Sequence, residues 1–292
     1  MTLITRILKP AAVLGAAILL TAAASIDELP AARKGPCPDA RGGWCDFIQD
    51  GARKTWLYAQ MSQNAYRADR GEYALPDGIV AGSRIENDIG FAYRIFERFE
   101  GAELKEVVVA FRGTEGWADW WHGNILGRQN RRGLEVVQRV FQDLADRGLT
   151  DVEVSVTGHS LGGGIAHYVS LRKIALSDGR EVAVSRSYVF NNSPRYWRGN
   201  GSQSVERIAM VEYGEILKLV RAPASEATQK YLSLNCRSNG LGAIKDHSMH
   251  YLAGCLTWIA AYTDEAAVKS GRLNRIDKPQ SQRSDDPPYE LD

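Results

Sequence analysis

A serine lies between two glycines where one hydrophobic pattern gives way to another. The pentapeptide Gly158-His159-Ser160-Leu161-Gly162 follows residues 152–156, whose valines alternate as in a strand, and precedes residues 161–169, whose apolar side chains have helical spacing. On such a sharp turn a serine hydroxyl is lifted clear of the sheet and can attack a carbonyl carbon. We therefore expect Ser160 to be a nucleophile. The alternative is a glycine-rich strand-to-helix turn without chemistry.

Attack by a serine requires donors for the oxyanion that forms. A helix that begins at Leu161 directs its first backbone N–H groups towards the serine, so the Leu161 N–H is one expected donor. Thr114 is the other, because it follows the apolar strand Val107–Phe111 in a loop and offers both an N–H and a hydroxyl. The alternative for this loop is a tight turn at Gly113.

A serine nucleophile also requires a general base, and the sequence has five histidines. With the order serine, acid, histidine, the base is His247 or His250. We favour His247, because it stands in a loop just before a predicted helix, whereas His250 lies within the first helical turn. The alternative for either residue is a surface histidine.

The acid that orients the histidine is expected at the carboxyl end of a strand, where the active sites of parallel sheets are found. Glu212 and Glu215 lie at the end of the predicted strand in residues 207–220. Glu215 follows the turn at Gly214 and is the predicted acid, with Glu212 as the second candidate. The alternative for both is a solvated carboxylate at the sheet edge.

The elements that position these residues alternate between strands and helices. Strands are predicted over residues 90–101, 104–114, 151–158, 181–194 and 207–220, and helices over residues 51–69, 133–148, 165–176 and 248–271. This alternation predicts an α/β fold in which helices flank a mostly parallel sheet. We expect one domain over residues 25–276 and a loose polar tail over residues 277–292.

The N-terminus and the cysteines indicate an exported protein. Residues 1–24 have a basic start, a short apolar run and small residues near Ala24, as in a cleaved signal peptide, so a secreted or periplasmic protein is expected. A retained membrane anchor is the alternative. Four cysteines suggest disulfides, and Cys37 with Cys45 and Cys236 with Cys255 are the natural pairs among three possible connectivities. Their spacing does not match a zinc site.

The balance of charge argues against one class of partner. The chain of 292 residues has 36 basic and 35 acidic residues and a formal net charge of +1. A nucleic-acid-binding protein needs a concentrated basic surface, so this class is not expected.

Four segments resemble the class 3 lipase family of α/β-hydrolases, in the family's order. They are VVVAFRGTEGWADWWHGNI, VTGHSLGGGIAH, YVFNNSPR and DHSM. The resemblance implies an α/β-hydrolase fold and a secreted bacterial enzyme that hydrolyses carboxylic esters of acylglycerols or phospholipids without a cofactor. It implies catalytic roles for Ser160, Glu215 and His247, and an oxyanion hole formed by Thr114 and Leu161. The expected partners are a lipid or ester substrate and a membrane surface that is contacted transiently.

The sequence departs from the family pattern in three places. The acid is normally Asp, and here the corresponding turn holds Glu215. Asn192 and Ser193 stand where a glycine is common. Residues 124–133 are polar and short where fungal members have an amphipathic lid, which favours soluble esters or phospholipids as substrates. The nearby Trp117, Trp120 and Trp121 would line an acyl pocket, touch a membrane or pack under the loop.

Two other functions remain open at this level. One is a hydrolase-fold protein that binds lipid or another partner without turnover, and it predicts that a member of the triad is missing. The other retains the triad but cleaves a thioester or a peptide bond, which the residue types by themselves permit.

Overall fold

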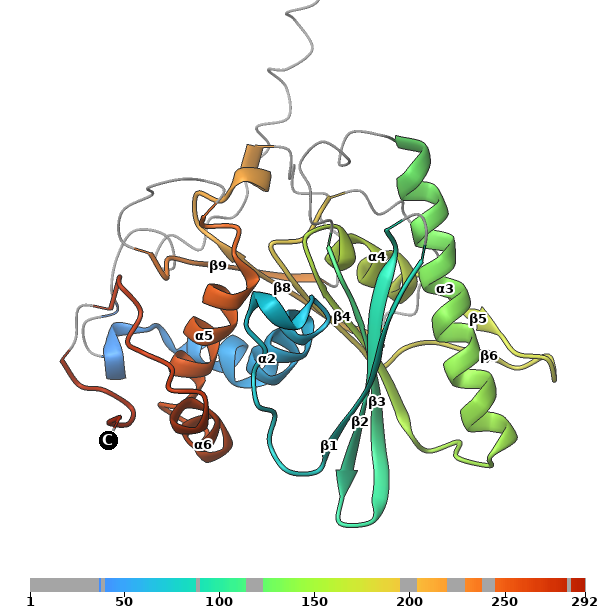
Figure 1. Cartoon of the computed structure of the whole chain (residues 1–292), viewed down its shortest axis with the longest axis horizontal. Coiled ribbons are helices and arrows are strands. Elements are labelled where there is room, and N and C mark those ends of the chain that lie inside the picture. Colours follow the sequence, from blue (N-terminus) through green and yellow to red (C-terminus); the bar gives the residue numbers. More distant parts are fainter. Residues whose placement is uncertain are drawn as a thin grey trace, which may run out of the picture.

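A mixed seven-stranded sheet forms the centre of the part of the protein that the structure describes. The computed structural model describes residues 37, 40–87, 90–113, 123–194, 204–219, 229–237, 245–282 and 285–291 (Figure 1). The strands lie in the order β1-β2-β3-β4-β7-β8-β9. Their bounds are β1 Ile79–Glu86, β2 Ala92–Glu100, β3 Glu103–Phe111, β4 Glu153–His159, β7 Arg186–Phe190, β8 Glu206–Glu212 and β9 Gln229–Leu234.

Five of these strands, β3 to β9 in the sheet order, run parallel, and β1 and β2 add an antiparallel edge. The register aligns the carboxyl ends of the parallel strands. Phe111 pairs with Gly158, His159 with Phe190, and Phe190 with Met210. The loops that follow β3, β4, β7 and β8 therefore leave the sheet at one edge, where ligands of parallel sheets bind.

Helices cover both faces of the sheet (Figure 1). Helix α2 (Asp46–Asn64) and helix α5 (Met249–Ala260) pack on one face in a core that includes Phe190, Met210 and Leu234. Helix α3 (Gly123–Asp146) and helix α4 (Leu161–Ser170) pack on the other face. Helix α6 (Glu265–Leu273) follows α5, and a small hairpin joins β5 (Ile174–Ala175) to β6 (Glu181–Val182).

The apolar run of β3 shows why both faces need a cover. Val107, Val109 and Phe111 contact the core under α3 and α4, whereas Val108 and Ala110 contact a core next to α2. Successive side chains of a strand point to opposite faces, so a continuous apolar strand is buried on both sides. With parallel strands between two layers of helices, the described chain has the α/β fold with a mostly parallel sheet that the sequence predicted, an arrangement that fits an α/β-hydrolase.

Several predicted elements end earlier than expected or are divided. The predicted strand over residues 181–194 is divided into β6 and β7, and the strand over 207–220 ends at Glu212, before a 3₁₀ helix over Ile216–Leu219. The predicted helix over 248–271 becomes α5 and α6, because Asp264 caps a new helix by accepting a hydrogen bond from the Ala266 N–H. Strands β1 and β9 were not predicted.

The end of the chain is packed more closely than its polar composition suggested. We expected residues 277–292 to be loose, but Tyr289 is buried and its hydroxyl donates to the Ile276 carbonyl oxygen at 2.9 Å. Gln282 is also buried and accepts a hydrogen bond from the indole Nε1 of Trp258 at 2.5 Å. The expectation of a loose tail is thus wrong for these residues, because single apolar and amide side chains anchor a mainly polar segment.

The two natural cysteine pairs are both disulfide-bonded, Cys37 with Cys45 and Cys236 with Cys255. The predicted signal peptide, residues 1–24, lies outside the described residues. Within the described ranges, none of the helices has the length and apolar character needed to cross a bilayer.

Candidate active site

Ser160 sits on a strained turn between β4 and α4. Its backbone angles are φ 56° and ψ −123°, a region that residues other than glycine rarely occupy. Three hydrogen bonds hold this conformation. The Ser160 N–H donates to the Phe190 carbonyl at 3.0 Å, and the Ser160 carbonyl accepts from the Ser193 N–H at 2.8 Å and the Gly164 N–H at 3.2 Å. The turn is therefore fixed from the strand, the helix and the loop after β7.

The glycines beside Ser160 allow the strand and the helix to approach each other closely. A Cβ atom on Gly158 would lie 2.5 Å from the backbone of Gly162, and a Cβ on Gly162 would overlap the Phe111 carbonyl group. Both contacts are with backbone, which cannot move aside. The G-x-S-x-G spacing thus has a steric cause, and this supports the interpretation of residues 158–162 as a nucleophile elbow.

The structure brings His247 and Glu215 into direct contact. The Nδ1 atom of His247 lies 2.7 Å from the Oε2 atom of Glu215. The Glu215 side chain is fully buried and the His247 side chain is 17% exposed. Glu215 also accepts a hydrogen bond from the Leu217 N–H at 2.9 Å, which fixes the carboxylate. With Nδ1 occupied by the carboxylate, Nε2 is the atom of His247 through which a proton could be exchanged with a substrate or a hydroxyl group.

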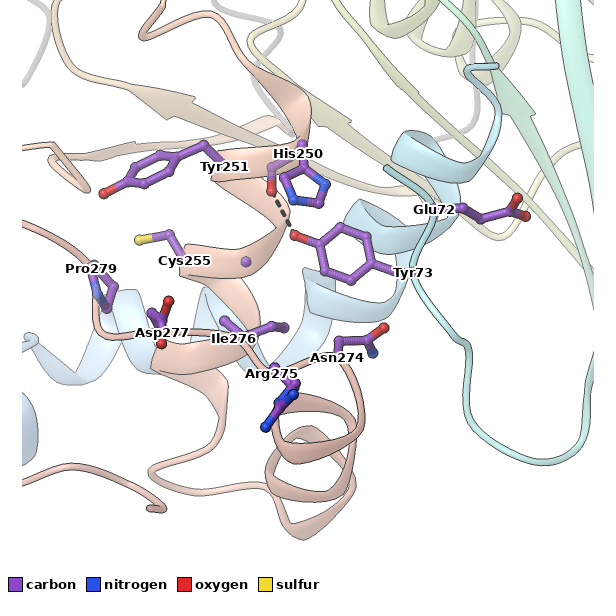
Figure 2. A pocket seen from close by; sticks show the side chains of 11 residues that line it. Glu72, Tyr73, His250, Tyr251, Cys255, Asn274, Arg275, Ile276, Asp277 and Pro279 are labelled. Carbon is purple, nitrogen blue, oxygen red and sulfur yellow. Dashed lines mark hydrogen bonds between the residues drawn. The ribbon is translucent and has the colours of Figure 1, made fainter. Parts of the chain in front are cut away.

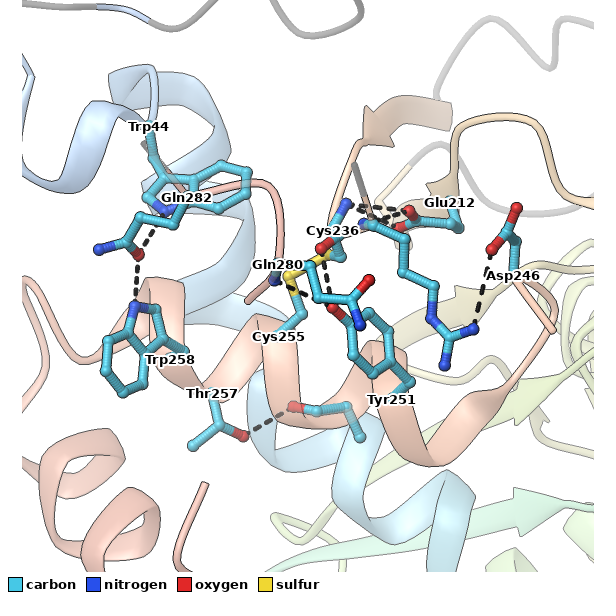
Figure 3. The surroundings of a disulfide bond; sticks show 12 residues. Trp44, Glu212, Cys236, Asp246, Tyr251, Cys255, Thr257, Trp258, Gln280 and Gln282 are labelled. Atoms are coloured by element: carbon cyan, nitrogen blue, oxygen red, sulfur yellow. Dashed lines mark hydrogen bonds and ion pairs between the residues drawn. A yellow bond between two sulfur atoms is a disulfide. The ribbon is translucent and has the colours of Figure 1, made fainter. Parts of the chain in front are cut away.

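Glu212 has a different set of partners. Its carboxylate accepts hydrogen bonds from the Cys236 N–H at 2.9 Å and from the Arg237 N–H at 3.0 Å, beside the Cys236–Cys255 disulfide (Figure 3). Burial raises the pKa of Glu212 to about 8, although these two N–H groups favour its charged form. Glu212 therefore anchors the chain after β9, and Glu215 contacts the histidine.

Three other histidines are located by the described structure. His167 is buried in α4, with Nδ1 3.1 Å from the Ser187 hydroxyl. His250 stacks on the ring of Tyr73 with a centroid distance of 4.9 Å and lines a pocket with Glu72 and Asn274 (Figure 2). His159 contacts His247, with ring centroids 4.6 Å apart. His122 lies outside the described residues.

The sequence did not assign a role to His159 or Tyr66, and the structure places both between the loops of the site. His159 Nε2 lies 2.8 Å from the His247 carbonyl oxygen, and Nδ1 lies 2.7 Å from the Tyr66 hydroxyl. The Tyr66 hydroxyl in turn accepts a hydrogen bond from the Gly113 N–H at 3.1 Å. The position of His159 inside the elbow was a visible signal for its location, but nothing in the sequence pointed to Tyr66.

Of the two predicted oxyanion donors, Leu161 lies within the described residues and Thr114 does not. Leu161 is the first residue of α4, so its N–H belongs to the first turn, whose N–H groups have no partner within the helix. Thr114 lies outside the described residues, as do Trp117, Trp120 and Trp121. Residues 124–133, the polar segment at the position of the fungal lid, belong to helix α3.

Metal ligands were not expected from the sequence. In the regions that the structure describes, no group of three or more His, Cys, Asp or Glu side chains has an arrangement that could hold a metal ion.

Residues 58–187 match the sequence profile of a phospholipase-like family, the Tle-like phospholipase domain. This segment runs from α2 to β7, so it includes Ser160, Tyr66 and His159 but ends before Glu215 and His247. No curated protein matches the chain.

Solved structures with partial similarity to this chain include those of a lipase and of an esterase. A lipase from Rhizopus microsporus var. chinensis has 16% sequence identity and a TM-score of 0.43, with 68% of this chain and 76% of the lipase covered. Two variants of the esterase rPPE have 10% and 11% identity and TM-scores of 0.34 and 0.35. They cover 83% and 80% of this chain and 93% and 97% of their own.

Proposed function

We propose that the protein is a serine carboxylester hydrolase that acts on lipid esters, with Ser160 as nucleophile, His247 as general base and Glu215 as the acid. The observation that carries the proposal is the strained Ser160 turn at the same sheet edge as the 2.7 Å contact between His247 and Glu215. A nucleophile on an elbow, with a histidine oriented by a buried carboxylate, is the arrangement used for acyl transfer.

The mechanism follows from the chemistry of these groups. Ser160 Oγ attacks the ester carbonyl while His247 Nε2 accepts its proton. Glu215 accepts a hydrogen bond from Nδ1–H and stabilises the imidazolium that forms. The Leu161 N–H, with Thr114 as the second donor, stabilises the oxyanion. The imidazolium then protonates the leaving alcohol, and water releases the acyl group with His247 again as the base.

The match to a phospholipase-like domain over residues 58–187 supports a lipase-type hydrolase and favours phospholipids among lipid esters. Acylglycerols are the second substrate class. The two disulfides are typical of a protein that works outside the reducing cytosol, which supports secretion or a periplasmic location with cleavage near Ala24. A transient contact with a membrane surface belongs to the same proposal.

The test is hydrolysis of p-nitrophenyl esters of graded chain length and of phospholipids labelled at each acyl position. We expect Ser160→Ala to lower kcat by about a thousandfold or more, because the nucleophile is lost. A Ser160→Ala variant as active as the wild type would show that Ser160 is not the nucleophile and would contradict the proposal. Lipid binding without turnover would then be the function that remains for this site.

The acid is tested by a matched pair of variants. Glu215→Gln is expected to lower kcat by about a hundredfold or more, because the amide no longer stabilises the imidazolium. Glu212→Gln is the control, since it changes a buried carboxyl that contacts the Cys236 and Arg237 backbone and not His247. The reverse result, with the loss confined to Glu212→Gln, would reassign the acid.

A further inference from the structure

A chain of hydrogen bonds connects the three loops that meet at Ser160. It runs from the Gly113 N–H, after β3, to the Tyr66 hydroxyl, then to His159 in the elbow, and ends at the His247 carbonyl. His159 is 5% exposed, so water cannot readily replace these partners. The chain therefore joins the end of β3, the nucleophile turn and the histidine loop through two side chains.

The partners fix the direction of two of the three hydrogen bonds. The His247 carbonyl oxygen can only accept, so His159 carries its proton on Nε2. When the His159 ring is neutral, Nδ1 is an acceptor, and the Tyr66 hydroxyl 2.7 Å away is its donor. The Tyr66 oxygen accepts the Gly113 N–H at 3.1 Å. The His247 carbonyl thus assigns a proton to Nε2 of His159.

This arrangement holds His247 at two points. Glu215 contacts the ring at Nδ1, and His159 contacts the backbone carbonyl. A contact with Glu215 alone would leave the backbone of the His247 loop free to move. The hydrogen bond from His159 to the His247 carbonyl also sets the distance between this loop and the elbow. A displacement of about 1 Å between reacting groups can cost about a hundredfold in rate.

There is also little space for another side chain in this chain of contacts. A Cβ atom on Gly113 would lie 2.6 Å from the Tyr66 hydroxyl and 2.9 Å from Ser160 Cβ. Glycine at this position thus allows Tyr66 to reach the backbone N–H that follows β3. The close packing indicates that the Tyr66 hydroxyl is held in a single position.

We propose that Tyr66 and His159 are positioning residues for catalysis, which set the place of His247 and of the Gly113 backbone relative to Ser160. The proposal rests on the function proposed above. Neither side chain is proposed to contact the substrate. Their effect should appear in kcat, because they align groups that act together in the transition state, and not in KM.

Tyr66→Phe removes the central hydroxyl and retains the ring. We expect kcat for a p-nitrophenyl ester to fall about tenfold or more, with KM within about twofold of the wild type. Tyr73→Phe is the matched control, because the Tyr73 hydroxyl donates at 2.7 Å to the His250 carbonyl, in the same segment as His247 but outside the chain of contacts (Figure 2). This control should retain kcat within about twofold.

Two substitutions of His159 separate alignment from general packing. In His159→Gln the amide reaches the Nε2 position and can still donate to the His247 carbonyl, whereas His159→Asn is too short to do so. We expect the glutamine variant to retain at least about fivefold more kcat than the asparagine variant at similar thermal midpoints. Adding Tyr66→Phe to His159→Asn should lower kcat little further, because both substitutions break the same chain of hydrogen bonds.

The outcomes distinguish this proposal from the proposed function. Ser160→Ala, assayed in parallel, tests the function, and wild-type kcat in Tyr66→Phe with an inactive Ser160→Ala would overturn the positioning role alone. Equal losses in Tyr66→Phe and Tyr73→Phe would also overturn it. Nitrogen-15 NMR of labelled histidine provides a readout without turnover, since His159 should be protonated at Nε2. A ring without a proton on Nε2 would contradict this chain of hydrogen bonds.

Discussion

Ser160 combines an unfavourable backbone conformation with a functional position at the end of a strand. A residue other than glycine at φ 56° costs about 1–3 kcal/mol, and it persists only where surrounding contacts impose it. Here the imposing contacts are the hydrogen bonds of the Ser160 backbone to Phe190, Ser193 and Gly164. The strain thus belongs to the turn that presents the hydroxyl, and its cost is offset by the sheet and by α4.

At the same scale, His167 makes the stability of the protein sensitive to acid. Burial, together with the positive charge of Arg207, lowers the pKa of His167 to about 3. Between about pH 6.5 and pH 3 the unfolded chain binds a proton that the folded state excludes, so the free energy of unfolding falls as the pH falls. In this interval the loss is about 1.4 kcal/mol for each pH unit, or about 3 kcal/mol by pH 4.5.

We therefore expect His167→Gln to reduce the loss of stability on acidification. The measurement is the free energy of unfolding from urea titrations at pH 7.5 and pH 4.5, compared between variant and wild type. His250→Gln is the control, because that histidine is exposed. Parallel losses in the wild type and His167→Gln would show that His167 does not contribute.

At the scale of elements, a buried carboxylate joins strands and helix far from the site. Glu106 on β3 is 1% exposed, and accepts hydrogen bonds from Tyr58 of α2 at 2.7 Å and Ser155 of β4. It also pairs with Arg98 of β2 at 3.0 Å and Arg186 of β7 at 3.2 Å. The Glu106 carboxylate therefore contacts residues of several elements, and its removal would leave Arg98 and Arg186 without their shared partner.

The prediction is that Glu106→Gln lowers the free energy of unfolding by about 3 kcal/mol, because it removes the buried charge that two partly exposed arginines share. Glu153→Gln is the control, since the 40% exposed Glu153 side chain also pairs with Arg186 but at the surface, and we expect a loss below about 1 kcal/mol. Chemical denaturation measures both. Similar losses in the two variants would argue against a special role of burial at Glu106.

At the scale of the whole molecule, the Cys236–Cys255 disulfide links the end of β9 to α5. Helix α5 begins two residues after His247, and the N–H of Cys236 donates to Glu212. The bridge therefore connects the last strand of the sheet to the segment that carries the predicted base. Because the two cysteines are 19 residues apart, closing this loop is expected to stabilise the fold by about 3 kcal/mol.

We expect the double substitution Cys236→Ser with Cys255→Ser to lower the free energy of unfolding by about 3 kcal/mol and to lower kcat at 25 °C. Cys37→Ser with Cys45→Ser is the control, because its bridge spans 8 residues at the start of α2 and joins no residue of β9 or α5. That variant should lose stability while its kcat remains near the wild-type value. An unchanged kcat in both double variants would separate the second bridge from the site.

The sequence by itself determined the features that depend on neighbours along the chain. Alternating valines, the glycines around Ser160 and the turn after Glu212 each act over a few residues, and they predicted the elbow, the sheet type and the position of His247 in a loop before a helix. Boundaries were less well predicted, as in β8 and in the division between α5 and α6, because capping and packing end an element where hydrophobicity continues.

The tertiary structure decided which distant side chains meet. Glu212 and Glu215 are three residues apart with similar surroundings in the sequence, and they differ because the chain after β9 offers N–H groups to Glu212 while His247 reaches Glu215. Tyr66 and His159 are separated by 93 residues and join only because the end of α2 lies beside the elbow. Local patterns specify local geometry, but hydrogen bonds between loops depend on how the sheet places their ends.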